Sequence, residues 1–237
     1  MSLVDEDFEY RDRVRAEALL FLLVEHSVNF DAAAMDMINK AVEQLICELS
    51  EIRSRWEVLV KIAALAFSSE PCWITAKGPV EAGQLNWEKL TAKGDSNFGT
   101  ACDALNEKLS KKTLMQKLCG NSTPVIAVLS SGNYKDDWEK SASRLWDNNR
   151  FKNAWKLCFA IGENASTFPL ARLTGTYDAV IEIAASDSCE AITRPIMRLI
   201  KERYFIDDWF PNQEEELRKL YGVLDWEEIN WGRFQYD

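Results

Sequence analysis

Residues 19–29 read LLFLLVEHSVN, and this stretch decides the fold. Residues 20–24 are all apolar, and the polar residues Glu25, Ser27 and Asn29 follow directly at alternate positions. An apolar run of this length that stops abruptly is typical of a central strand buried on both faces of a parallel sheet. Ligands of open parallel sheets bind just outside the carboxyl ends of the strands. We therefore expect this polar tip to line a crevice in which the three side-chain oxygens converge.

The rest of the chain alternates apolar runs with amphipathic segments. Further runs of strand length occupy residues 56–67, 72–76, 124–129, 155–161 and 179–183. Apolar residues at helical spacing, together with capping residues, predict helices over 31–54, after 99, from 136 or 137, near 168–173 and over 189–204. Strands that alternate with helices favour parallel βαβ units. The sequence thus predicts an α/β fold with a doubly wound, mostly parallel sheet of six strands and helices on both faces.

Length and composition exclude several classes of protein. The 237 residues, of which 47% are hydrophobic, suit one large α/β domain or one domain with an elaborated end. Apolar runs of about 18 residues are absent, so we expect no membrane partner and no membrane span. The charged N-terminal segment lacks the apolar region of a signal peptide. A net charge of −10 disfavours nucleic acid as the partner.

The cysteines indicate the compartment. The chain has six of them, without a C-x-x-C pair and with a single histidine to assist metal binding. Scattered cysteines of this kind are typical of free thiols in a reducing environment. We therefore expect a cytoplasmic protein.

The C-terminal segment differs from the rest, so we divide the chain into a domain over 1–203 and an extension over 204–237. The extension has nine acidic and three basic residues, a net charge of 3 − 9 = −6, and nine aromatic residues. Disordered acidic tails are poor in aromatic residues. We expect the extension to dock on the domain or on a partner.

Three segments resemble the von Willebrand factor type A (VWA) family. Residues 22–29 stand where the family has a first strand and a D-x-S-x-S tip; residues 94–101 (GDSNFGTA) resemble its G-G-T-x-L-G-x-A segment; and residues 123–138 (TPVIAVLSSGNYKDDW) resemble its P-x-x-x-L-L-S-D-G-x-x-T-D-D-W segment. The A-I-G at 160–162 and L-T-G at 173–175 are similar to signatures of its bacterial TerY-like branch, which is associated with tellurite-resistance and stress operons. The resemblance implies a Rossmann-like sheet of strand order 3-2-1-4-5-6 with an antiparallel edge strand.

The family's metal-ion-dependent adhesion site (MIDAS) implies a set of site residues here. Glu25 stands at the first Asp position, Ser27 matches a Ser, Asn29 replaces the second Ser, Ser96 replaces the Thr, and Ser131 replaces the last Asp. Mg²⁺ relies on carboxylate charge and near-octahedral oxygens. We therefore expect a degenerate site without a cofactor. If Mg²⁺ did bind, its ligands would be Glu25, Ser27, Asn29 and Ser96.

These residues predict a non-enzymatic interaction module. Its partner-binding residues would be Glu25, Ser27, Asn29, Asp95, Ser96 and Ser131, with the Glu25 carboxylate facing a Lys or Arg of a protein partner. The resemblance implies a kinase or phosphatase of the same operon as that partner. Two alternatives are a Mg²⁺-dependent adhesion module and a serine hydrolase with Ser131 as nucleophile and His26 as base, although the first Gly of the G-x-S-x-G elbow is absent.

Overall fold

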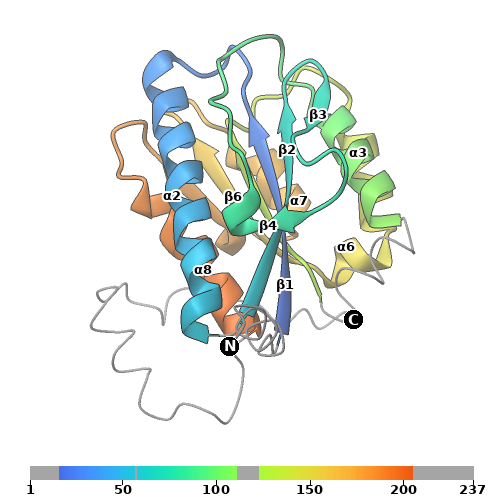
Figure 1. Ribbon diagram of the computed structural model, residues 1–237. Helices are drawn as coiled ribbons and strands as arrows, with labels where there is room; N and C mark the ends of the chain where they lie inside the picture. The colour runs from blue at the N-terminus through green and yellow to red at the C-terminus, as the bar shows by residue number, and fades with distance from the viewer. Residues whose placement is uncertain (1–15, 57, 111–122, 205–237) are drawn as a thin grey trace, which may run out of the picture.

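A seven-stranded sheet forms the centre of the molecule (Figure 1). The computed structural model describes residues 16–56, 58–110 and 123–204. The strands are β1 (Ala16–Glu25), β2 (Val58–Phe67), β3 (Pro71–Trp73), β4 (Val80–Glu81), β5 (Val125–Ser130), β6 (Trp155–Ile161) and β7 (Val180–Ile183). Their order is β3-β2-β1-β5-β6-β7, and β4 also pairs with β2. All pairings are parallel except those of β3 and β4 with β2. The predicted strand order and antiparallel edge are therefore confirmed.

Helices cover both faces of the sheet, as expected. They are α2 (Ala32–Trp56), α3 (Phe98–Ser110), α5 (Trp138–Trp146), α6 (Asn149–Asn153), α7 (Thr167–Thr174) and α8 (Glu190–Tyr204), with the short 3₁₀ turns η1 (Ala82–Gln84) and η2 (Tyr177–Ala179). One core cluster joins α2 and α8 to the sheet, and the other joins α3, α5, α6 and α7 to its opposite face (Figure 1).

Strand β1 is central because both of its faces are covered. It pairs with β2 along its whole length and with β5 from Leu20 to Val24. Leu20 and Leu22 point into the cluster with α2 and α8, whereas Phe21 and Leu23 point into the cluster with α3. Because successive side chains of a strand alternate between faces, a strand covered on both sides must be apolar throughout. Glu25 ends β1 on the α3 side of the sheet.

The structure also corrects and limits several expectations. Strand β4 lies outside the runs of strand length expected from the sequence, because a two-residue strand is too short to give a periodic signal. At the start of α2, the Asp31 carboxylate accepts a hydrogen bond from the Ala34 N–H at 2.8 Å. The extension from residue 205 onward and Cys119 lie outside the described residues.

The described cysteines, Cys47, Cys72, Cys102, Cys158 and Cys189, are free thiols. Among the helices that the structure describes, none is long and apolar enough to cross a membrane.

A close backbone contact fixes the end of β5. Gly132 has φ 69°, and a Cβ atom on it would lie 1.9 Å from the carbonyl oxygen of Ser166. The N–H of Ser166 also donates to the carbonyl of Ser131 at 2.8 Å. Only glycine allows the segment before α7 to approach β5 this closely.

We predict that Gly132→Ala lowers the free energy of unfolding by about 3 kcal/mol or more, because left-handed strain and a backbone clash add. Gly162→Ala is the matched control: Gly162 has φ 106°, but nothing lies within 4 Å of its added Cβ. It should lose only about 1–2 kcal/mol. Urea unfolding of both variants measures the difference, and equal losses would show that the contact with Ser166 does not constrain the fold.

Candidate functional site

The polar ends of β1 and β5 lie side by side at the carboxyl edge of the sheet, the upper edge in Figure 1. The register pairs Val24 with Leu129, which puts the next two residues, Glu25 and Ser130, beside each other. The side chains that follow each strand therefore share one space. The predicted neighbourhood of the two strand ends is confirmed.

The Glu25 carboxylate lies at the centre of this space and is fully buried. Its Oε1 accepts hydrogen bonds from Ser27 Oγ at 2.6 Å and from Asn29 Nδ2 at 3.1 Å. Its Oε2 accepts hydrogen bonds from Ser130 Oγ at 2.6 Å and from the Ser131 N–H at 2.8 Å. The Ser131 hydroxyl lies 3.1 Å from both carboxylate oxygens. We refer to these five residues as the Glu25 network.

The serine oxygens of the network also accept hydrogen bonds. Ser27 Oγ accepts from the Asn29 N–H at 3.1 Å, and Ser131 Oγ accepts from Asn29 Nδ2 at 3.0 Å. Ser130 Oγ accepts from the Gly132 N–H at 3.0 Å and lies 3.0 Å from the Tyr134 hydroxyl. Because Ser130 gives its single hydrogen to Glu25, Tyr134 must be the donor to Ser130. Each hydroxyl of the network is thus used both as donor and as acceptor.

Tyr134 supports the network from the α3 side. Its ring stacks on Phe98 with centroids 4.3 Å apart and meets Trp138 edge to face. Burial, with the negative charge of Glu25 as a second cause, raises the pKa of the Tyr134 hydroxyl well above its usual value. The phenol therefore stays neutral and keeps donating to Ser130.

A third segment, residues 94–97, lies between the two strand ends. The N–H of Val28 donates to the carbonyl of Gly94 at 3.0 Å, and the N–H of Lys135 donates to the carbonyl of Ser96 at 2.8 Å. The Ser96 side chain is 1% exposed, and its hydroxyl has no partner among the described atoms. Asp95 is exposed, and the described hydrogen bonds of the Glu25 network do not include it.

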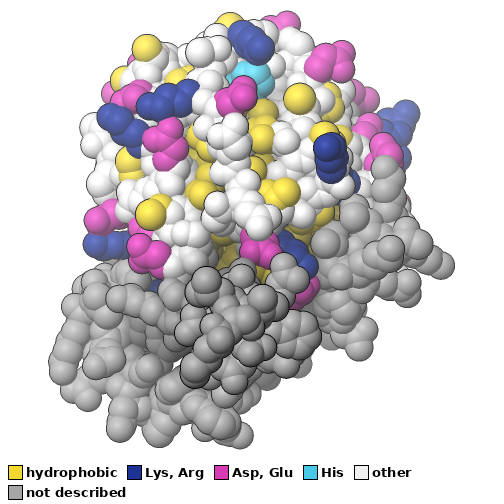
Figure 2. Space-filling view, viewed as in Figure 1, with side chains coloured by type: hydrophobic (Ala, Val, Ile, Leu, Met, Phe, Trp, Pro, Cys, Tyr) yellow, Lys and Arg dark blue, Asp and Glu magenta, His cyan; other side chains and the backbone are white. Residues whose placement is uncertain are grey.

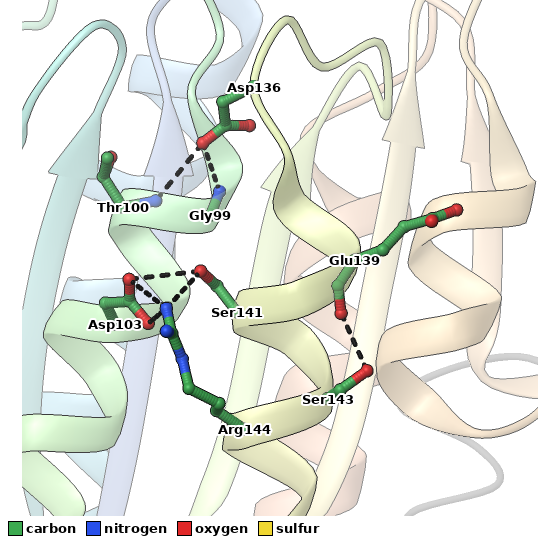
Figure 3. A network of polar contacts seen from close by, with 8 residues as sticks. All are labelled: Gly99, Thr100, Asp103, Asp136, Glu139, Ser141, Ser143 and Arg144. Atoms are coloured by element: carbon green, nitrogen blue, oxygen red, sulfur yellow. Dashed lines mark hydrogen bonds and ion pairs between the residues drawn. The ribbon is translucent and has the colours of Figure 1, made fainter.

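The segment after β5 is also tied to helix α3 (Figure 3). One oxygen of Asp136 accepts hydrogen bonds from the N–H groups of Gly99 at 2.7 Å and Thr100 at 3.4 Å, at the start of α3. One turn further along α3 lies Asp103, and its carboxylate is contacted by Arg144 of α5 at 2.8 Å. Because a carboxylate at a helix N-terminus satisfies unpaired N–H groups, these contacts hold the β5 end in a fixed position against α3.

Several solved structures are similar to this chain in fold. No protein-family model matches the chain, and the curated proteins contain no match. Proximal thread matrix protein 1 from the mussel byssus is similar in structure, with a TM-score of 0.57 and 10% identity over 79% of this chain and 46% of that chain. A von Willebrand factor type A structure from Catenulispora acidiphila gives 0.55 and 11% over 79% and 43%. The conserved hypothetical protein BatB from Bacteroides thetaiotaomicron gives 0.55 and 10% over 78% and 98%. The chain spans less than half the length of the first two.

The chain has a VWA fold. The sequence resemblance implies a metal-ion-dependent adhesion site at these strand ends, but the residues of the Glu25 network do not fit a divalent cation. Glu25 is the single carboxylate of the network, and both of its oxygens already accept hydrogen bonds from the protein. The residues that the structure describes contain no group of three or more His, Cys, Asp or Glu that could hold a metal ion.

The structure brings together most of the site residues predicted at the ends of the two central strands, which we call the VWA tip. Glu25, Ser27, Asn29 and Ser131 converge, whereas Asp95 stays outside the network. The expectation that Glu25 faces a partner's Lys or Arg is wrong, because its side chain is 0% exposed. Ser130 was missed, although its position directly at the end of the apolar run 124–129 was the available signal.

Among the described contacts, His26 and Ser131 do not form the pair that a serine hydrolase would need. Nδ1 of His26 lies 3.1 Å from the carbonyl oxygen of Thr91. The Ser131 hydroxyl contacts Glu25, Asn29 and Asn133 instead. Nucleophilic catalysis by serine needs a hydrogen bond between the nucleophile and its base, and the described contacts of these two residues do not provide one.

We predict that Ser130→Ala lowers the free energy of unfolding by about 2–3 kcal/mol, because the buried Glu25 carboxylate loses a charge-assisted hydrogen bond and Tyr134 loses its acceptor. Ser143→Ala is the matched control, since this exposed serine bonds the Glu139 carbonyl within α5 and no other described residue. Its effect should stay within about 0.5 kcal/mol. Chemical denaturation measures the free energy of unfolding of both variants. If Ser130→Ala lowers it no more than Ser143→Ala does, Glu25 does not depend on this donor.

We also predict that His26 contributes to acid sensitivity. Burial is the main cause that lowers the pKa of the His26 imidazole below 6.5. The unfolded chain therefore binds a proton below pH 6.5 that the folded chain does not, and stability falls as the pH drops from there toward the folded pKa. The slope is at most about 1.4 kcal/mol per pH unit. His26→Gln should lose less stability than the wild type between neutral pH and pH 5.5 in urea titrations; parallel losses would exclude a role for His26.

Proposed function

We propose that this chain is a non-enzymatic, VWA-like protein-interaction module that binds a protein partner at the carboxyl ends of β1 and β5. The observation that carries the proposal is the buried Glu25 network, which fixes the exposed groups above it. Those groups are Val28, Asn29, Asn133, Asn164 and Phe168, and we refer to them as the tip face.

Side-chain amides link the strand ends across the tip face. Asn29 Nδ2 donates to the carbonyl of Asn133 at 2.8 Å, and Asn133 Nδ2 donates to the carbonyl of Asn164 at 2.8 Å. These two bonds connect the ends of β1, β5 and β6 in a row. A partner would meet amide groups that are already held in place, so less side-chain entropy is lost on binding.

Exposed apolar side chains flank this row. Val28, at the end of β1, is 64% exposed, and Phe168, at the start of α7, is 52% exposed. A protein partner can cover both with its own apolar side chains while it bonds the amides. On the face that Figure 2 shows, basic side chains are interspersed with acidic ones. A mixed surface of this kind suits a protein partner better than a nucleic-acid backbone.

The predicted partner-binding residues then fall into two groups. Asn29 and Asp95 are exposed and would touch the partner. Glu25, Ser27, Ser96 and Ser131 are buried, and we assign them the positioning of the tip face from behind.

The resemblance of the sequence to the TerY-like branch supports a narrower proposal. The module would act in the cytoplasm, in a stress or tellurite-resistance system, with a kinase or phosphatase of the same operon as partner. The partner itself would be identified by capture from the native cell and mass spectrometry.

We predict that Val28→Asp and Phe168→Asp each weaken binding of the identified partner at least about tenfold, equivalent to 1.4 kcal/mol, because a charge replaces an apolar contact. Tyr177→Asp is the matched control: Tyr177 is 59% exposed but lies in η2, before the amino end of β7. Its affinity should stay within about twofold of the wild type. Titration calorimetry with the purified partner measures all three; equal affinities for the wild type and both tip variants would place the binding surface elsewhere.

A further inference from the structure

We propose that the side-chain amide of Asn29 takes the structural role of a cation at these strand ends, so that the VWA tip of this chain is complete without metal. The inference concerns the arrangement of the Glu25 network alone. It holds or fails whether or not the tip face binds a partner.

The nitrogen of the Asn29 amide lies among oxygens from both strand ends. Nδ2 is 3.1 Å from Glu25 Oε1, 3.0 Å from Ser131 Oγ and 2.8 Å from the carbonyl oxygen of Asn133. Glu25 belongs to β1, whereas Ser131 and Asn133 follow β5. A positively polarised group surrounded by acceptors from two strands holds them together, as a bound cation does.

The spacing of these oxygens suits N–H donors and not a metal ion. Mg²⁺ requires oxygens at about 2.1 Å and Ca²⁺ at about 2.3–2.6 Å. Because the shortest contact of Nδ2 is 2.8 Å, every oxygen would have to move inward by about 0.7 Å or more to hold Mg²⁺. The Asn29 side chain would also have to leave the space.

The hydrogen bonds of the Glu25 carboxylate and of the serine hydroxyls support the same conclusion. Glu25 accepts hydrogen bonds from Ser27, Asn29, Ser130 and Ser131. A cation on either carboxylate oxygen would displace some of these donors and leave them buried without partners. The hydroxyl lone pairs that could ligate a metal accept hydrogen bonds from Asn29 and Asn133.

Two sequence changes at this site match each other in chemistry. Relative to the VWA pattern, Asn29 introduces an amide donor where a Ser stands, and Ser131 removes the carboxylate of the last Asp. Asn29 supplies a neutral hydrogen-bond donor. Ser131 lacks the negative charge that a divalent cation would balance. Both favour the amide over a metal ion.

Thermal unfolding of the full wild-type chain tests the inference directly. We expect the Tm to change by less than about 1 °C between EDTA and millimolar Mg²⁺, Ca²⁺ or Mn²⁺, since a ligand stabilises only a state that it binds. We also expect electron paramagnetic resonance to show no bound Mn²⁺. A cation-dependent rise in Tm or a bound Mn²⁺ signal would overturn the inference.

A single substitution tests the position of the amide. Asn29→Asp keeps the shape but replaces the donor with a second carboxylate next to Glu25. In EDTA we expect its Tm to fall by about 4 °C or more, because the donor is lost and two carboxylates lie next to each other. Asn153→Asp is the matched control, because the side chain of this exposed asparagine bonds the Asn149 carbonyl within α6 and nothing else in the described part of the chain. Its Tm should change little.

The variant also has outcomes that contradict the inference. An Asn29→Asp chain as stable in EDTA as the wild type would mean that the amide holds nothing together. A loss of Tm equal to that of Asn153→Asp would count against the inference in the same way.

Discussion

The hydrogen bonding of one buried carboxylate is the constraint on which the tip of this molecule depends. Burying an ionised carboxylate is costly unless hydrogen bonds replace its water. Glu25 has no exposed surface, and its donors come from its own strand end and from the end of β5. The two strand ends are therefore held together by the need to satisfy one charge. The Asn29 and Asn133 amides at the tip are positioned by the same two strand ends.

The fold supplies the position of this carboxylate. Strand β1 is apolar on both faces because helices pack against both, and Glu25 is its last residue. Parallel pairing with β5 then fixes which serine lies beside it. Tyr134, stacked on Phe98 of α3, closes the network from the side. Buried polar networks that are fully satisfied rigidify their surroundings, and a rigid base suits a surface that recognises a partner.

Much of this could be predicted from the sequence, because periodicity and strand-end polarity are local signals. The apolar run before Glu25 and the run before Ser130 gave the central strands, and the resemblance gave their order. The burial of Glu25 could not be predicted, since it depends on donors from a strand about 100 residues away in the sequence. Strand β4 gave no periodic signal. The role of Ser130 needed the register of β1 against β5, which a single strand does not contain.

A double-mutant cycle between Glu25→Gln and Ser130→Ala tests the central claim most directly. If the carboxylate holds the two strand ends together, the two substitutions remove the same interaction. The account then predicts that their effects on the free energy of unfolding fail to add by about 1.5–3 kcal/mol. Effects that add to within about 0.5 kcal/mol would show that Glu25 and Ser130 act independently, and the account would be wrong.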